Sequence, residues 1–213
     1  MKPKNIIFDL GGVFLPLNMQ ATLNAFKKLG AKDFESIYTF KNQGEVFNLF
    51  DKGLITSDEF RMEIKNNLRA DTTFDQIDNA WNAMLNIIPQ NQIEFIESIK
   101  NEFNVFLLSN TNAIHVARFE ADHLHHYGYN LFDSLFTKAY YSSSVGMRKP
   151  DKEVFDYVLS TNNLRAEETV FFDDSPQHVQ GALNAGISAY HLNLDKEDIK
   201  ILFQRTVKNR FKQ

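Results

Sequence analysis

The chain has 213 residues, a length that suits one domain carrying an insertion or two small domains. Hydrophobic residues make up 43% and charged residues 23%, an ordinary globular composition that argues against extensive disorder. The formal net charge of −4 gives no support to nucleic-acid binding, and the absence of cysteine excludes disulfide scaffolds, thiol nucleophiles and cysteine metal sites. No apolar run is long enough to cross a bilayer, and the polar start ahead of Ile6 is unlike a signal peptide. We therefore expect a cytoplasmic protein that binds neither membrane nor nucleic acid.

The first predicted element is a strand over residues 6–8. Its apolar residues do not alternate with polar ones, which is typical of a strand buried on both faces. Asp9 follows the strand directly. Gly11 and Gly12 come next, and paired glycines permit a sharp change of chain direction.

Residues 17–87 are predicted to form a helical insertion, because they show helix patterns and no convincing strand. Leu23, Phe26 and Leu29 recur at helical spacing ahead of Gly30. Two capping boxes, Thr56 with Glu59 and Thr73 with Gln76, mark the starts of further helices. We therefore expect residues 1–16 and 88–213 to form the core and residues 17–87 a separate helical unit.

The remaining chain alternates strands with helices. Residues 105–108 and 170–172 repeat the pattern of the first strand, and residues 135–141 and 188–192 are weaker strand candidates. Helical periodicity separates these runs, which indicates an α/β fold with a parallel sheet and crossover helices.

Polar residues follow several of these strands. They are Asp9 after the first strand, Ser109, Asn110 and Thr111 after the second, Asp173 and Asp174 after residues 170–172, and Lys149 just ahead of a predicted helix. A helix cap or a solvated lysine would explain each residue alone, but not their joint placement. Ligands of open parallel sheets bind at the carboxyl ends of the strands, so we expect these side chains to converge. Clustered carboxylates favour a hard cation such as Mg²⁺, and a carboxylate can act as the nucleophile of phosphoryl transfer.

The same residues carry a resemblance to the haloacid-dehalogenase-like (HAD) hydrolase superfamily. Residues 6–13, Ile-Ile-Phe-Asp-Leu-Gly-Gly-Val, resemble its first motif, and residues 107–111, Leu-Leu-Ser-Asn-Thr, resemble its second. Residues 147–150, Met-Arg-Lys-Pro, and residues 171–175, Phe-Phe-Asp-Asp-Ser, resemble its third and fourth. The resemblance extends over essentially the whole chain and implies a Rossmann-like parallel sheet with an inserted helical C1 cap. It is greatest to a bacterial subgroup that includes phosphatases of glucose 1-phosphate and other sugar phosphates.

The resemblance implies a role for each motif residue. Asp9 would be the nucleophile of a Mg²⁺-dependent phosphatase, with Ser109 and Lys149 as catalytic partners and a small phosphorylated molecule as substrate. Asn110 and Gly11 would contact that substrate. The implied ligands of the metal are Asp9, the Gly11 carbonyl group, Asp173 and Asp174. The sequence does not distinguish a monomer from a dimer.

Gly11 departs from the pattern of the superfamily. Phosphatases of the superfamily usually carry there an aspartate that protonates the leaving group, and losing a general acid–base group costs on the order of 10² to 10⁴ in rate. Two alternatives therefore stay open. One is a carbon–halogen hydrolase that uses Asp9 without Mg²⁺, and the other is a binding protein that kept the fold but lost catalysis.

Two further groups of residues stand outside these motifs. Glu45 lies in a segment that resembles the part of the cap facing the core, and we keep it as a candidate substrate contact. His123, His125 and His126 form a short histidine run, but a closed zinc site usually needs four ligands. For His115 we expect a packed or surface position.

Overall fold

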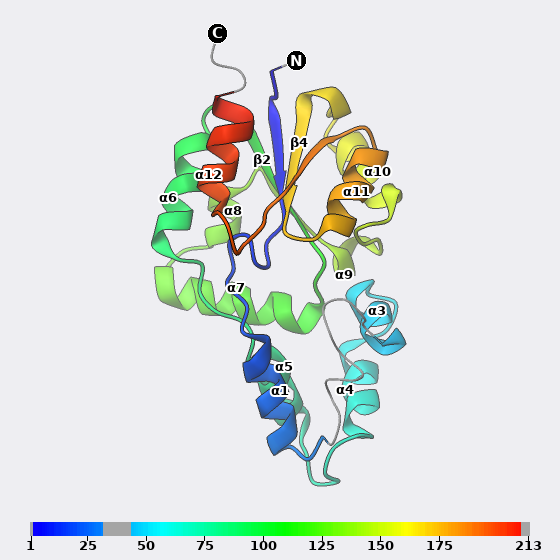
Figure 1. Ribbon diagram of the computed structural model, residues 1–213. Coiled ribbons are helices and arrows are strands. Elements are labelled where there is room, and N and C mark those ends of the chain that lie inside the picture. Colours follow the sequence, from blue (N-terminus) through cyan, green and yellow to red (C-terminus); the bar gives the residue numbers. More distant parts are fainter. Residues whose placement is uncertain (1, 32–43, 210–213) are drawn as a thin grey trace.

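The protein folds around a five-stranded parallel sheet. The structure is a computed structural model that describes residues 2–31 and 44–209. The strand order is β3-β2-β1-β4-β5. The strands are β1 (Asn5–Phe8), β2 (Asn104–Ser109), β3 (Lys138–Tyr141), β4 (Thr169–Asp173) and β5 (Ser188–His191). All four strand pairings are parallel, which confirms the predicted α/β fold with crossover connections (Figure 1).

Helices cover both faces of the sheet, which agrees with the apolar residues in the middle of the central strands. One face is covered by α6 (Gln90–Ile99), α7 (Ala113–Tyr127), α8 (Leu131–Leu135) and α12 (Ile199–Phe203), the last continuing into a π-helical turn, η2 (Gln204–Lys208). The other is covered by α10 (Lys152–Thr161) and α11 (Pro176–Asn184), while α9 (Ser142–Val145) and the short 3₁₀ helix η1 (Ala166–Glu168) lie in the connections. Alternate residues of one strand serve the two faces, because successive side chains of a strand point in opposite directions.

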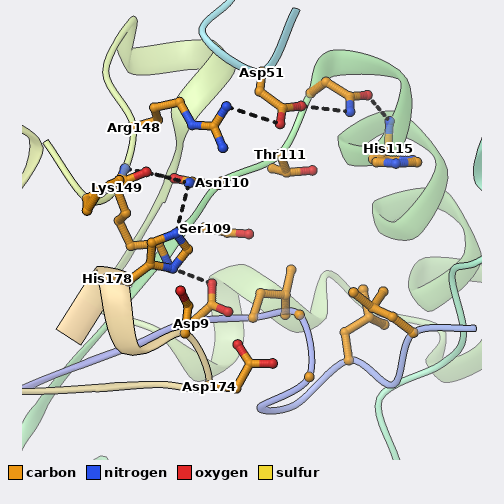
Figure 2. Close-up of a pocket in the computed structure, with 18 of the residues that line it drawn as sticks. Asp9, Asp51, Ser109, Asn110, Thr111, His115, Arg148, Lys149, Asp174 and His178 are labelled. Atoms are coloured by element: carbon orange, nitrogen blue, oxygen red, sulfur yellow. Dashed lines mark hydrogen bonds and ion pairs between the residues drawn. The ribbon is translucent and has the colours of Figure 1, made fainter. Parts of the chain in front are cut away.

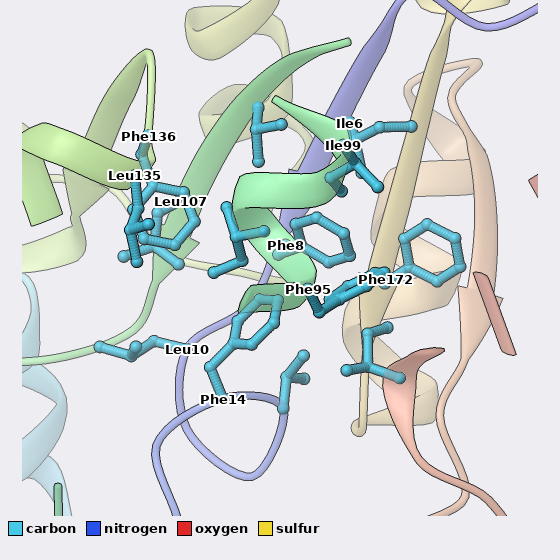
Figure 3. Packing of buried hydrophobic residues seen from close by; sticks show 14 of the residues in the cluster. Ile6, Phe8, Leu10, Phe14, Phe95, Ile99, Leu107, Leu135, Phe136 and Phe172 are labelled. Carbon is cyan, nitrogen blue, oxygen red and sulfur yellow. The ribbon is translucent and has the colours of Figure 1, made fainter. Parts of the chain in front are cut away.

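Phe8 shows how the core supports the end of β1. It is fully buried, its ring stacks on that of Phe172 at 5.3 Å, and Phe14 meets it edge-on at 5.0 Å (Figure 3). Ile7, the preceding residue, packs instead in the cluster on the opposite face of the sheet. With both faces of β1 fixed in this way, the residue that follows Phe8 has a defined position.

The helical insertion has an apolar core of its own. Its described helices are α1 (Met19–Lys28), α3 (Glu45–Asp51), α4 (Ser57–Lys65) and α5 (Phe74–Asn82), and they lie beyond the carboxyl ends of the strands (Figure 1). Phe47, Phe50, Phe60 and Trp81 are all buried in this cluster. Both predicted capping boxes are present at α4 and α5. Residues 32–43 of the predicted insertion lie outside the described residues.

Two neighbouring segments join the insertion to the core. Leu17 and Leu85 form an antiparallel bridge, and the N–H of Asn18 donates to the carbonyl of Met84 at 2.8 Å. Ile88 follows, and its N–H donates to Nε2 of His123 at 2.9 Å. The predicted boundaries at residues 16/17 and 87/88 stay a prediction. The pairing of Leu17 with Leu85 places the segment that enters the insertion beside the segment that leaves it.

Each of the two weaker strand predictions differs from the structure at one end. Leu135 belongs to α8, whose start Asn130 caps by accepting a hydrogen bond from the N–H of Asp133, and β3 begins only at Lys138. Strand β5 ends at His191, one residue before its predicted end. Across the described ranges, no helix is both long and apolar enough to traverse a lipid bilayer.

Candidate active site

The four predicted motifs meet in one cavity of ≈1250 Å³ between the sheet and the insertion. Asp9 follows β1, and its N–H still pairs with the carbonyl of Phe172 on β4 at 2.9 Å. Ser109 ends β2, and Asp173 ends β4. Lys149 arrives from the loop after α9. Asp9, Ser109, Asn110, Lys149 and Asp174 all line the cavity, as Figure 2 shows.

Lys149 links two of the carboxylates. Its Nζ atom lies 2.6 Å from Oδ1 of Asp9 and 2.6 Å from Oδ2 of Asp173, and its side chain is completely buried. Burial alone would lower the pKa of Lys149, but Asp173 and Asp9 outweigh it and raise that pKa. The lysine is therefore held as a cation between two acids.

Asn110 fixes the backbone of Lys149 from the end of β2. Oδ1 of Asn110 accepts a hydrogen bond from the N–H of Lys149 at 2.9 Å, and Nδ2 donates to the carbonyl of the same residue at 2.8 Å. The resemblance assigns the substrate contact of Asn110 to its backbone, and the side chain is engaged with the backbone of Lys149. It still lines the cavity, and its backbone stays the part predicted to hold phosphate.

Asp173 has protein partners on both oxygens. Oδ1 accepts a hydrogen bond from the N–H of Ser175 at 2.7 Å, and Nδ1 of His178 lies 3.0 Å from each oxygen. Burial raises the pKa of Asp173, but Lys149 and His178 together hold it below its ordinary value. His178, in the first turn of α11, was not predicted to be a site residue. Its place soon after the acidic doublet was the available signal.

Asp9, Asp173 and Asp174 each offer a carboxylate oxygen within 4.8 Å of the others, the one such group of acids or histidines within residues 2–31 and 44–209. Burial, followed by the charges of Asp9 and Asp173, raises the pKa of Asp174 to about 7. Burial is also the main reason that the pKa of Asp9 is raised, although Lys149 acts against it. Three carboxylates that share one lysine cation offer oxygen ligands and uncompensated negative charge, and both favour a hard cation such as Mg²⁺.

Gly11 and Gly12 bring the chain close to this acidic group. Gly12 has a positive φ of 75°, and a Cβ atom there would lie 2.5 Å from Oδ2 of Asp174. A Cβ atom on Gly11 would meet Cδ1 of Leu17 at 2.9 Å. A side chain at position 11 therefore requires Leu17 to move, whereas one at position 12 is opposed by both the backbone conformation and the Asp174 carboxylate.

The insertion forms the opposite end of the cavity. Glu45 lines it as an exposed residue at the start of α3. Asp51, Asn112 and Arg148 line it too, and the sequence analysis did not select them as site residues. Asp51 carries no distinguishing local pattern, and although Arg148 belongs to the third motif, its contact with Asp51 depends on how α3 packs on the core.

The histidine run has structural partners. His123 is buried, and its Nδ1 lies 2.6 Å from the carbonyl oxygen of Phe119 while Nε2 accepts from the N–H of Ile88. Both ring nitrogens are therefore in use. His115 is packed as expected: its ring stacks on Trp81 at 4.7 Å and Nδ1 donates to Oδ1 of Asn82 at 2.9 Å.

Comparison with known proteins gives consistent results. The family model described as haloacid dehalogenase-like hydrolase matches residues 6–191. D-ribitol-5-phosphate phosphatase of Bacteroides thetaiotaomicron is 27% identical over 187 residues, which is 88% of this chain and 90% of that protein. A crystal structure of a HAD family enzyme from Bacteroides thetaiotaomicron, an aspartate-to-alanine variant in complex with magnesium and inorganic phosphate, matches with a TM-score of 0.87 and 33% identity, covering 94% of this chain and 98% of that one.

A HAD-like hydrolase from Porphyromonas gingivalis, described as predicted, matches with a TM-score of 0.86 and 29% identity over the full length of both chains. Taken with the matched family model, these similarities establish that the chain belongs to the haloacid dehalogenase-like hydrolases. It is accordingly a hydrolytic enzyme, with the α/β fold and four motifs described above.

Proposed function

We propose that this enzyme is a Mg²⁺-dependent phosphatase that hydrolyses a small sugar or polyol phosphate through a phosphorylated Asp9. One observation carries the proposal: Lys149 bridges Asp9 and Asp173 at 2.6 Å beside Asp174, in a cavity large enough for a small metabolite. A cation held between two acids, next to a third acid, suits a substrate whose reacting group is itself anionic.

Asp9 is the nucleophile in this proposal. Its carboxylate oxygen attacks phosphorus, the ester P–O bond breaks, and the alkoxide leaves and takes up a proton from water. Water then attacks the same phosphorus, the bond between phosphorus and Asp9 breaks, and phosphate departs as the carboxylate re-forms. Lys149 and the hydroxyl of Ser109 would bind the phosphoryl oxygens, whose charge spreads during the transfer.

The acidic group fits a Mg²⁺ ion, and the side-chain contacts favour some ligands over others. Asp173 already bonds to Lys149, Ser175 and His178, so we assign it the task of orienting the lysine. Asp9, Asp174 and the Gly11 carbonyl group would hold the cation. When bound, Mg²⁺ would neutralise negative charge on the phosphoryl oxygens.

Gly11 leaves the departing alcohol without the usual carboxylic acid. Because a missing general acid lowers the rate on the order of 10² to 10⁴, turnover should depend strongly on how well the leaving group carries negative charge. Aryl phosphates should therefore react faster than alkyl phosphates that bind equally well.

The substrate class is supported by the similarity to D-ribitol-5-phosphate phosphatase, whose length the match covers almost completely. The magnesium and phosphate present in the related crystal structure support the metal and the reacting group. These similarities favour a phosphatase over a carbon–halogen hydrolase.

The test is phosphate release from p-nitrophenyl phosphate and from a panel of sugar and polyol phosphates, with Mg²⁺ and with a chelator. We expect activity that disappears with the chelator, and a loss on the order of 10³-fold or more in Asp9→Asn. Halide release from a haloacid, unaffected by the chelator, would establish the dehalogenase alternative. Absence of turnover on every phosphate ester would favour the binding protein.

A further inference from the structure

A second polar cluster lies at the far end of the cavity from the catalytic acids. Asp51 ends α3 and is buried, with its side chain only 9% exposed. Nδ2 of Asn112 donates to Oδ1 of Asp51 at 3.2 Å, and Nη1 of Arg148 lies 4.0 Å from the other oxygen. Nη1 of Arg148 also donates to Oδ1 of Asn48, on the same helix. We call Asp51, Asn112 and Arg148 the distal polar cluster.

The orientation of Asn112 is set by the elements around it. Asn112 caps α7, and its Oδ1 accepts hydrogen bonds from the N–H of His115 at 3.1 Å and from Nε1 of Trp81 at 3.4 Å. Because the amide oxygen is used in this way, the NH₂ group must face Asp51. The NH₂ group of Asn112 is thus a fixed donor beside the Asp51 carboxylate.

The distal polar cluster lies where the organic part of a bound phosphate ester would reach. In Figure 2, Asp9 and Asp174 stand at one end of the cavity and Asp51 with Arg148 at the other, with Ser109 and Thr111 between. Apolar side chains, Leu17, Leu54 and Leu85 among them, also line the cavity. A molecule whose phosphate lies at Asp9 therefore meets carboxylate, amide and guanidinium groups together with apolar surface.

We propose that the distal polar cluster recognises the hydroxyl groups of the substrate and that Asp51 is its specificity-determining residue. The proposal rests on the proposed phosphatase function and narrows it to monophosphates whose organic part is an uncharged polyol or sugar. The Asp51 carboxylate accepts hydrogen bonds from hydroxyl groups, while Arg148 and Asn112 donate to hydroxyl oxygens. The charges of Asp51 and Arg148 offset each other, so the distal polar cluster supplies no net cation for a second anionic group, which disfavours bisphosphates and phosphorylated acids.

A purely structural role makes a different prediction. Asp51 and Arg148 also join the insertion to the core, as does the ion pair between Nζ of Lys52 and Oδ2 of Asp151 at 3.1 Å. If these contacts only held α3 in place, their loss would lower turnover of every phosphate ester by the same factor. Recognition of hydroxyl groups instead affects only the esters that carry them.

The test compares the intact enzyme with Asp51→Asn and, as matched control, Lys52→Gln, which removes the other ion pair between insertion and core at the cavity wall and leaves the distal polar cluster intact. We would measure kcat/KM for D-ribitol 5-phosphate, for a hexose bisphosphate, and for p-nitrophenyl phosphate, which has no hydroxyl on its organic part. We expect Asp51→Asn to lower kcat/KM for the polyol phosphate roughly 10- to 100-fold, mainly through KM, while p-nitrophenyl phosphate changes less than about 3-fold. The relative rate on the bisphosphate should rise, and Lys52→Gln should show no such discrimination.

An equal fall on all substrates would overturn the inference and leave Asp51 a structural contact, as would no change on any. Failure of the proposed function is separately visible, because the intact enzyme would then release no phosphate from p-nitrophenyl phosphate. Circular dichroism and the thermal midpoint of each variant establish that it folds. For a variant that fails to fold, Arg148→Lys, which keeps the positive charge but loses the planar donor pair, provides the same substrate comparison.

Discussion

Asn110 holds Lys149 by both polar groups of its backbone, accepting from the N–H at 2.9 Å and donating to the carbonyl at 2.8 Å. The lysine side chain then reaches two carboxylates without exposure to solvent. The end of β2 thereby fixes a residue that arrives from a loop 39 positions further along the chain. Catalysis in the proposed mechanism depends on this placement, because a small displacement of a charged group weakens its effect on the transition state.

Asn110→Ala should lower kcat by about 10- to 100-fold while leaving the fold intact. The substitution removes both hydrogen bonds to the Lys149 backbone and allows the ammonium group to shift from Asp9. Steady-state kinetics with p-nitrophenyl phosphate measures the loss. Asn162→Ala, which removes an amide near the distant Tyr140, is the control and should retain activity. Unchanged kcat in Asn110→Ala would contradict the positioning role.

Asp174→Asn should stabilise the metal-free protein at pH 8 and abolish its stabilisation by Mg²⁺. Burial and neighbouring acids raise the pKa of Asp174 to about 7 in the fold, above its ordinary 3.8. Its contribution to stability is therefore complete at low pH and is lost as the pH rises through about 7. Mg²⁺ should raise the thermal midpoint of the intact enzyme at pH 8, because it binds only the folded carboxylates. Equal Mg²⁺ shifts in enzyme and variant would remove Asp174 from the metal site.

His115 should make the protein sensitive to acid. Burial lowers the pKa of its imidazole from 6.5 to about 3, so the stability that it contributes is present above pH 6.5 and is lost as the pH falls towards 3. At about 1.4 kcal/mol per pKa unit, the loss at pH 5 is roughly 2 kcal/mol. Denaturant unfolding between pH 7 and pH 5 should show a smaller decline in His115→Gln than in the intact protein. An equal decline in His115→Gln and in the intact protein would contradict this account.

Gly11→Asp tests whether a missing acid limits the rate. A Cβ atom at position 11 meets Cδ1 of Leu17 at 2.9 Å, so the single variant should lose activity through displacement of that side chain. The double variant with Leu17→Ala should recover, and should exceed the parent on alkyl phosphates, where protonation of the leaving group matters most. Leu17→Ala alone is the control. If the double variant stays slower than Leu17→Ala on alkyl phosphates, another group supplies the proton.

The sequence predicted the parts of the fold that local patterns determine. The unalternating runs around Phe8 and Phe171 became buried central strands, and the capping residues Thr56 and Thr73 began helices α4 and α5. Leu135 was assigned to the wrong kind of element, because the cap at Asn130 outweighs the apolar run that follows it. Burial of apolar residues decided the two strands, and local hydrogen bonds decided where the helices begin.

One part of the candidate site could be predicted from the sequence, and the other part could not. Asp9, Ser109 and the acidic doublet occupy the ends of neighbouring strands, so the strand order brings them together, and Asn110 at the end of β2 holds Lys149 beside them. Asp51 and Arg148 meet only because the insertion docks on the core. They are 97 positions apart in the chain, and no local sequence pattern predicts their contact. The proposed catalytic end was thus open to prediction, while the end that faces the organic part of the substrate was not.

Trapping the phosphorylated intermediate tests the central claim most directly. The enzyme is mixed rapidly with substrate and Mg²⁺, quenched in acid and reduced with borohydride, which converts an aspartyl-phosphate into homoserine, and the digested protein is analysed by mass spectrometry. Our account predicts homoserine at position 9 alone, and none in Asp9→Asn. Homoserine at another aspartate, or none at any position while an initial burst of released alcohol shows that a covalent intermediate accumulates, would contradict it.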